Sequence, residues 1–125
     1  MLEICLDKRL PVYEQIIDYY KQAIASGKLA PGSQIPSRRE LAQEWGVNPN
    51  TVQKAYKEMS ALGLIYTEGN SLSKVTEDRQ LLERLRKELI EQAVIDFIEK
   101  IGPFELKEDR IIDIIHEYYQ GRVGE

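Results

Sequence analysis

The sequence predicts a mainly α fold with one small β-hairpin. Apolar residues recur at helical spacing over most of the chain, and proline or capping residues precede these runs while glycine follows them. One stretch, LIYTEGNSLSKVT, has instead the pattern of two short strands joined by a turn. The order of these patterns predicts three helices, then the hairpin, then two further helices.

The first two helices are bounded by clear start and stop signals. Pro11 opens the first helix, which has the apolar spacing of PVYEQIIDYYKQAIA, and Gly27 closes it. A loop, KLAPGSQIP, leads to Ser37, which we expect to cap the helix RRELAQEW together with Glu40 in a capping box. This short second helix ends at Gly46.

The third helix begins at one defined point in GVNPNTVQKAYKEM. Asn48 can cap its free amide groups, and Pro49 takes the first helical position, where its missing N–H costs nothing. Gly63 ends the helix. The spacing predicts an apolar face of Val52, Ala55, Tyr56, Met59 and Leu62, opposite a polar face of Asn50, Gln53, Lys54 and Lys57.

The hairpin and the last two helices follow. Ile65 and Tyr66 lie in the first expected strand and Val75 in the second, with a turn around residues 68–71. A helix from Glu77 ends before Gly102-Pro103, and another runs from about residue 107 to 119. The apolar stripe of the longer helix comprises Leu81, Leu82, Leu85, Leu89, Ala93, Val94, Phe97, Ile98 and Ile101, and that of the last comprises Ile111, Ile112, Ile115 and Tyr119.

Composition is typical of a globular protein, with 42% hydrophobic residues among 125. The single cysteine, Cys5, excludes an intrachain disulfide, and no apolar run approaches the roughly 18 residues of a membrane span, so we expect a cytoplasmic protein that does not bind membranes. The net charge of −4 is unevenly divided along the chain. The part up to Val75 contains nine basic and eight acidic residues, and the remainder contains eight basic and thirteen acidic residues. Contact with a polyanion is therefore expected in the first part.

Two short helices joined by the tight turn WGV, with a helix before them and a hairpin after them, are interpreted as a winged helix-turn-helix. In this architecture the second helix of the pair enters the DNA major groove and the first contacts the backbone. Asn and Gln can pair with adenine edges, and Lys and Arg with guanine or phosphate. The expected DNA-binding residues are Arg38, Arg39, Asn48, Asn50, Thr51, Gln53, Lys54, Lys57 and Lys74.

Residues 10–75 also resemble the N-terminal domain of the GntR family of bacterial transcription regulators. The resemblance is carried by Y-x-Q-I, G-x-L-x-P-G, P-S-x-R-x-L-A and G-V-x-x-x-T-V, and NPNTV makes the chain most similar to the YtrA-like branch. It implies DNA contacts from Arg39, from the start of the third helix and from the wing glycine, Gly69, and regulation of a transporter operon. The wing departs from the family pattern, because it is acidic at Glu68 and lacks the second glycine.

We expect two domains, the winged helix-turn-helix in residues 1–75 and a dimerisation tail in residues 76–125. Two helices do not enclose a ligand cavity of the usual 300 to 1,000 Å³, so their long apolar stripe is better buried against a second copy. The alternative is a monomer with the tail packed down. The resemblance to the YtrA-like branch implies the dimer. The expected dimerisation residues are Leu85, Leu89, Val94, Phe97, Ile101, Ile112 and Ile115. A groove beside the tail leaves room for an unidentified small-molecule effector.

The preferred function is a dimeric repressor that binds double-stranded DNA at a palindromic operator, with activation also open. The alternative is a winged-helix module that binds protein. No nucleophile–base pair, phosphate loop or metal cluster indicates an enzyme or a cofactor. His116 with Asp109, Asp113 and Glu117 is interpreted as a surface cluster rather than a metal site, and Cys5 as a small buried residue, with a redox switch as the alternative. Tyr19, Tyr20, Tyr118 and Tyr119 are expected to serve in packing.

Overall fold

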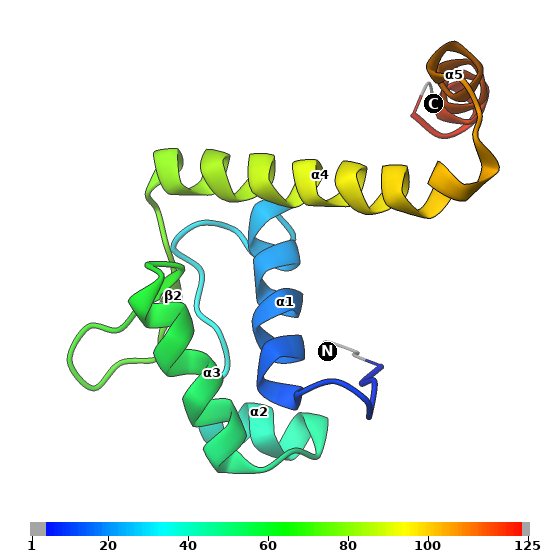
Figure 1. The fold of residues 1–125 in the computed structure, drawn as a ribbon. Coiled ribbons are helices and arrows are strands. Elements are labelled where there is room, and N and C mark those ends of the chain that lie inside the picture. The colour runs from blue at the N-terminus through cyan, green and yellow to red at the C-terminus, as the bar shows by residue number, and fades with distance from the viewer. Residues whose placement is uncertain (1–4, 124–125) are drawn as a thin grey trace. The chain divides into compact units, whose positions relative to one another are not determined.

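The computed structural model describes residues 5–123, and the chain divides into two compact units. The first ends at Leu89 and the second begins at Ile90, so the division falls inside one helix. The first unit contains α1 (Val12–Ala25), α2 (Arg38–Trp45), α3 (Pro49–Ala61), the strands β1 (Ile65–Tyr66) and β2 (Lys74–Val75), and the start of α4 (Arg79–Ile101) (Figure 1). The second contains the remainder of α4, a 3₁₀ turn η1 (Gly102–Phe104) and α5 (Glu108–Val123).

The capping residues expected from the sequence define the starts of α2 and α3. The Ser37 side chain accepts a hydrogen bond from the Glu40 backbone N–H at 3.1 Å, and the Glu40 carboxylate accepts one from the Ser37 N–H at 3.1 Å. The Asn48 side chain accepts from the backbone N–H of Asn50 at 2.8 Å, and Pro49 is the first residue of α3. Both predicted starts are therefore confirmed.

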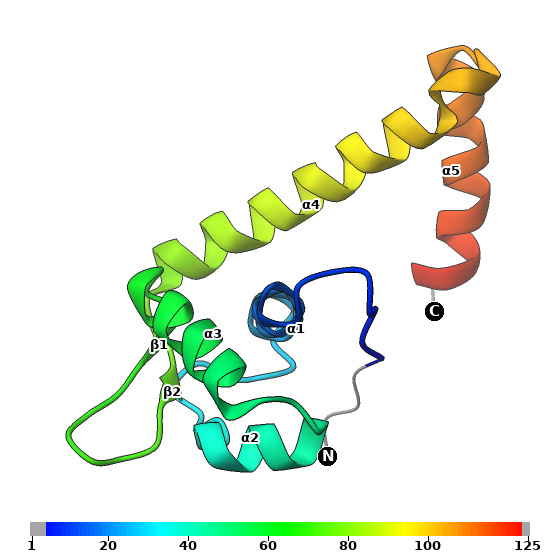
Figure 2. The same ribbon diagram turned by 60° about the horizontal axis from the view of Figure 1, so that its bottom comes forward.

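Three helices enclose the core of the first unit. Helix α3 packs against both α1 and α2, as Figure 2 shows. Tyr20 of α1 stacks on Trp45 of α2, with ring centroids 6.2 Å apart, and meets Tyr56 of α3 edge-on. The predicted apolar face of α3 is buried at Val52, Ala55, Tyr56 and Met59. Leu62 was expected on this face but is 48% exposed, because it lies at the C-cap, where α3 has already ended.

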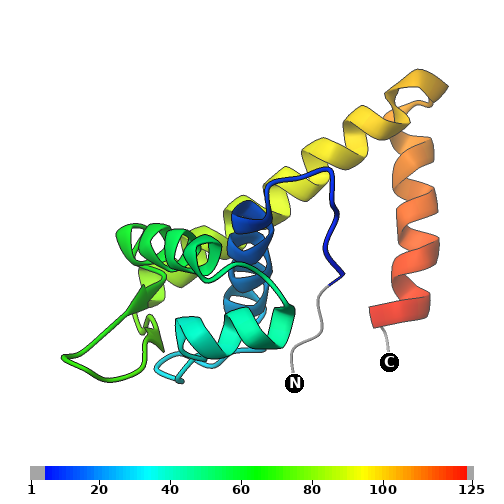
Figure 3. The same ribbon diagram turned by 90° about the horizontal axis from the view of Figure 1, so that it is seen from below.

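The hairpin has the expected position and turn. Ile65 pairs with Val75 and Tyr66 with Lys74 in antiparallel register. The turn is closed by a hydrogen bond from the Ser71 N–H to the Glu68 carbonyl at 3.0 Å. Gly69 within it has φ +58°, a conformation that glycine adopts without strain. The loop between the strands extends away from the helices of this unit (Figure 3).

A third extended segment joins the hairpin. Sequence reasoning treated residues 28–36 as a loop, but Ile35 donates to the Ser73 carbonyl and Val75 donates to the Ser33 carbonyl, each at 2.9 Å. These bonds tie the chain entering α2 to strand β2. Ile35 is 1% exposed as a result. The wing and the helix-turn-helix are thus connected through backbone hydrogen bonds as well as through the core.

Helix α4 starts two residues later than predicted. The Asp78 side chain accepts hydrogen bonds from the backbone N–H groups of Gln80 and Leu81 at 3.1 and 3.2 Å, so Asp78 acts as the N-cap of α4. Leu85 is buried in the core of the first unit, and Leu89 packs against that core. This part of the predicted stripe therefore has a partner within the chain.

The second unit has no core of its own. Of residues 90–121, none is buried, and only Ile101 and Ile111 are half-buried. Helix α5 extends to Val123, beyond the predicted end at 119. The expectation that Tyr118 and Tyr119 pack against other residues is not met within this chain, since both are more than 60% exposed. Exposed apolar side chains on α4 and α5 include Ile90, Val94, Ile95, Phe97, Ile98, Ile112, Ile114 and Ile115.

Two further expectations concern the burial of Cys5 and the possibility of a membrane-spanning helix. Cys5 was expected to be buried, but it is exposed, because the segment before α1 lies outside the core. None of the helices in residues 5–123 is long and apolar enough to cross a membrane.

Candidate nucleic-acid interface

The interface is built on the face of α3 that the core leaves free. Asn50, Gln53 and Lys57 are spaced by three and four residues, which places them along one side of the helix. All three are exposed, as is Lys54 next to them, while Thr51 is half-buried. The opposite side is anchored by Val52 and Tyr56, at 0% and 1% exposure. The polar face is therefore held in a fixed orientation by the packing behind it.

Helix α2 presents two arginines at its start, Arg38 and Arg39, and both are exposed. The Arg38 guanidinium lies 5.8 Å from the centroid of the Tyr56 ring. The Tyr56 hydroxyl in turn donates to the Pro36 carbonyl at 2.7 Å. One side chain of α3 thus fixes both the entry into α2 and one of its arginines.

Burial and hydrogen bonding shift the pKa of two groups close to this surface. Burial raises the pKa of Tyr56 to about 12, so its hydroxyl stays a proton donor at neutral pH. Hydrogen bonds from the backbone and side chain of Ser37 hold the pKa of Glu40 below its ordinary value. The carboxylate at the start of α2 is consequently charged at neutral pH and complements the positive end of the helix dipole.

Lys54 is held by an aromatic ring. Its Nζ lies 3.9 Å from the centroid of Tyr13, which stands at the start of α1. This cation–π contact orients the ammonium group without neutralising it. A phosphate or a base edge would therefore meet a charge whose position is already restricted.

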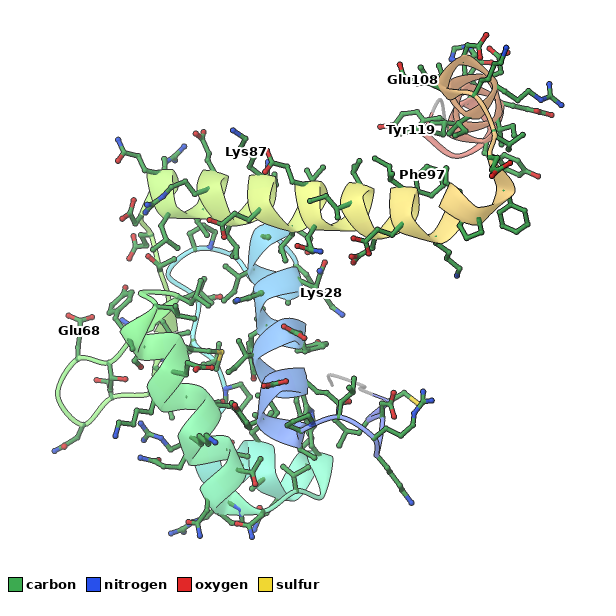
Figure 4. The ribbon with its side chains drawn as sticks, in the orientation of Figure 1. Lys28, Glu68, Lys87, Phe97, Glu108 and Tyr119 are labelled. Atoms are coloured by element: carbon green, nitrogen blue, oxygen red, sulfur yellow. The ribbon has the colours of Figure 1, made fainter. Side chains whose placement is uncertain are left out.

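The wing provides the last two predicted residues. Gly69 is exposed at the turn, and no atom would lie within 4 Å of a Cβ added there. Lys74 is half-buried, and its Nζ lies 3.6 Å from Oε1 of Glu68. Figure 4 shows Glu68 on the loop between β1 and β2. The cation of the wing is thus paired with an acid of the same wing.

All ten predicted DNA-binding residues lie in the first unit, on α2, at the N-cap of α3 or along α3, or in the hairpin. The predicted dimerisation residues are divided: Leu85 and Leu89 belong to the core of the first unit, whereas Val94, Phe97, Ile101, Ile112 and Ile115 lie in the second.

In the second unit, His116 faces Gln120, with Nε2 atoms 3.1 Å apart. Within residues 5–123, no three His, Cys, Asp or Glu side chains are grouped as a metal would require.

Sequence reasoning missed the aromatic contacts of Lys54 and Arg38 and the Glu68–Lys74 pair. The ring contacts join residues of different elements, Tyr13 with Lys54 and Tyr56 with Arg38, so no local spacing could reveal them. The wing pair was accessible in principle, because Glu68 lies in the turn of a predicted hairpin and Lys74 at the start of its second strand, where residues on the two sides of the turn approach each other.

Comparison with known proteins assigns the fold and the family. The model for bacterial regulatory proteins of the gntR family matches residues 12–74. The HTH-type transcriptional repressor YtrA of Bacillus subtilis is 39% identical over 101 residues, which is 77% of this chain and 78% of YtrA.

Two solved structures extend this likeness. A GntR family transcriptional regulator from Listeria monocytogenes has a TM-score of 0.82 and 31% identity, covering 90% of this chain and 98% of that one. The structure of AraR(DBD) in complex with operator ORX1 has a TM-score of 0.51 and 30% identity, covering 61% of this chain and 93% of that one. The fold is thus the winged helix-turn-helix of these regulators, and the chain belongs to the GntR family of bacterial regulatory proteins.

Proposed function

We propose that this protein is a sequence-specific DNA-binding transcriptional regulator that acts as a dimeric repressor at a palindromic operator. The observation that carries the proposal is the capped helix α3, whose polar face of Asn50, Gln53 and Lys57 is free while its other face is fixed in the core. The likeness to AraR(DBD), a structure that contains operator DNA, supports the same use of this surface. The family contains transcriptional regulators, and we infer no enzymatic activity for this chain.

In this proposal the residues divide into two roles. Arg38 and Arg39 at the start of α2 contact phosphates and set the position of the protein on the duplex. Asn50 and Gln53 contact base edges in the major groove, where amide side chains pair best with adenine. Lys57 contacts phosphate or guanine, and Thr51, Lys54 and the cap residue Asn48 stand beside it at the groove.

The dimer is proposed on the surface of the second unit. Residues 90–121 bury no side chain within the chain. Ile90, Ala93, Val94, Phe97 and Ile115 line an apolar cavity of about 340 Å³. A second copy would cover these residues by the same symmetric contact on both partners, and would present two copies of α3 to a site with two-fold symmetry. Figure 4 labels Phe97 on α4 and Tyr119 on α5, the two helices that carry the apolar residues of the second unit.

A small-molecule effector is proposed at a cavity of the first unit. Lys21, Leu62, Leu64, Leu81, Arg84, Leu85 and Glu88 line a space of about 200 Å³. Four leucines suit a short aliphatic chain, and two cations against the one acid, Glu88, leave a net positive charge for a carboxylate. The cavity borders the end of α3 and the start of α4, so a ligand there could bias the helix that contacts DNA. Tighter operator binding with hexanoate than with hexanamide would support this site, and its persistence in Arg84→Gln would contradict it.

The proposed function is tested by selecting bound sequences from a random duplex library at two salt concentrations. We expect enrichment of a palindrome whose half-sites lie about one helical turn apart, with affinity falling steeply as salt rises. Weak, unselective binding at low salt alone would favour the alternative of a protein-binding winged helix. The net charge of −4 and the paired wing lysine are the observations that favour that alternative.

A further inference from the structure

The wing of this protein carries a carboxylate beside its own cation. Oε1 of Glu68 lies 3.6 Å from Nζ of Lys74, and the Glu68 side chain is 67% exposed while that of Lys74 is 32% exposed. The Lys74 side chain is thus partly enclosed, and the acid beside it is the more exposed of the two. A phosphate that approaches Lys74 would also meet the negative charge of this carboxylate.

The hairpin holds these two groups together. Tyr66 pairs with Lys74 in the strand register, and the hydroxyl oxygens of Thr67 and Ser73 lie 2.6 Å apart across the hairpin. The turn bond from Ser71 to Glu68 then closes the loop directly after the acid. Three interactions along the ladder therefore fix the positions from which both side chains project.

A carboxylate and a phosphate compete for one ammonium group. The ammonium group has three donors and can contact both anions, but its charge, already paired with Glu68, attracts a duplex phosphate less strongly. A negative charge left beside the duplex also repels neighbouring phosphates within a Debye length of about 10 Å at 0.1 M salt. Both effects oppose binding, and neither depends on the base sequence.

We propose that Glu68 is a negative determinant of DNA affinity, which pairs with Lys74 and weakens the attraction between the wing and a duplex phosphate. This inference rests on the proposed DNA-binding function. It assigns the acidic wing a role in setting the strength of binding, so that base contacts from α3 decide which sites are occupied. A regulator weakened in this way for all sequences alike leaves non-specific DNA more readily.

The test compares the wild type with Glu68→Gln, Lys74→Gln, the double variant and the control Glu83→Gln. Glu83 is an exposed residue of α4, outside α2, α3 and the hairpin, and its substitution changes the net charge equally. Affinity is measured for the selected operator and for an unrelated duplex, at several salt concentrations. Melting temperatures establish that every variant is folded.

Glu68→Gln is expected to bind both duplexes about threefold to tenfold more tightly at low salt. Its salt dependence should be steeper, by up to about 0.9 in the logarithmic slope, because one more phosphate is neutralised. The control should change affinity by less than about twofold. The gain from Glu68→Gln should be smaller when Lys74 is also replaced, because only the direct repulsion of phosphates is then relieved.

Equal affinities for Glu68→Gln and Glu83→Gln would overturn the proposal, as would a gain that is undiminished without Lys74. If the wild type binds no duplex at all, the DNA-binding function itself fails, and that result is distinguishable from one in which the wild type binds and Glu68→Gln does not differ from it.

Discussion

Single polar side chains determine where α3, the helix proposed to enter the major groove, begins. Asn48 accepts the hydrogen bond of the Asn50 N–H, and Pro49 leaves no amide to satisfy at the first position. A shift of one residue would rotate every side chain of α3 by about 100°. Gln53 would then leave the free face and Val52 would leave the core. Local capping therefore contributes to sequence reading, although the capping atoms need not contact a base.

The capping box makes the stability of the folded protein depend on pH. The pKa of Glu40 lies below its ordinary value in the folded chain because the Ser37 N–H donates to its carboxylate. A lowered folded pKa gives a contribution to stability that is present above the unfolded pKa of about 4.5 and is lost as pH falls through the folded value. We expect Glu40→Gln to be less stable than the wild type at pH 7.

Denaturant unfolding at several pH values measures this difference, which should shrink as pH falls from about 5 to 3. Glutamine keeps the hydrogen-bonding oxygen and removes the charge, so the comparison isolates ionisation. A difference that is constant over this range would show that the charge of Glu40 contributes nothing.

Two side chains of the interface should affect DNA binding in different ways. Arg39→Ala is expected to weaken binding to all duplexes alike and to reduce the logarithmic salt slope by about 1, because a phosphate contact is lost. Gln53→Ala should instead change the preference between sites, by about 1–3 kcal/mol at the base pair that it reads. Titration of the operator and of single-base variants measures both effects. The assignment fails if neither substitution changes affinity or selectivity.

Helix α4 carries two apolar series rather than one stripe. Leu81, Leu85 and Leu89 recur every four residues, and a second series recurs every four residues from Ile90. The second series is displaced by one residue, which is about 100° around the helix, so the two series cannot form one continuous face. The first is buried or half-buried in the first unit, and the second is exposed at Ile90, Val94 and Ile98. One helix therefore presents two different apolar faces, of which only the first is covered within this chain.

This division predicts separate effects of two charge substitutions. Leu85→Asp places an unpaired carboxylate in the core of the first unit and should destabilise it by at least about 3 kcal/mol. Phe97→Asp changes a residue that is 40% exposed in this chain, so it should leave the first unit folded and abolish the dimer. Thermal unfolding and sedimentation measure the two outcomes. An unchanged dimer in Phe97→Asp would contradict the proposed interface.

Dimerisation links the two units in function without requiring a fixed arrangement of one on the other. In the proposal, one unit contacts the DNA and the other joins two chains. The second half-site is then bound at the high effective concentration that a linked partner provides. The acidic surplus beyond Val75 fits a part of the protein that does not contact DNA.

Loss of the dimer should consequently appear as loss of operator affinity. Phe97→Asp is expected to bind the palindrome roughly 100-fold more weakly than the wild type. Its affinity for an isolated half-site should be unchanged, since α3 and the arginines of α2 are intact. Binding of both duplexes by both proteins measures the effect, and equal losses on palindrome and half-site would show damage to the DNA-binding unit instead.

The sequence by itself determined the helices α1 to α3, the hairpin and the residues at which α2 and α3 begin. Ser37, Glu40 and Asn48 act through hydrogen bonds to amides two or three residues away, and Gly46 and Gly69 adopt positive φ where the chain turns. These interactions are local, so residue type and spacing are sufficient to predict them. The polar face of α3 was predictable for the same reason, because helical periodicity separates it from the buried face.

Only the tertiary structure decided which residues from distant segments meet. The pairing of residues 32–35 with β2 and the contact of Tyr13 with Lys54 join segments whose separation along the chain carries no periodic signal. The same holds for the long helix: its pattern indicated apolar contact, but packing decided that Leu85 lies in the core and Phe97 remains exposed. Burial depends on what another element places against a side chain, and that is a property of the folded chain.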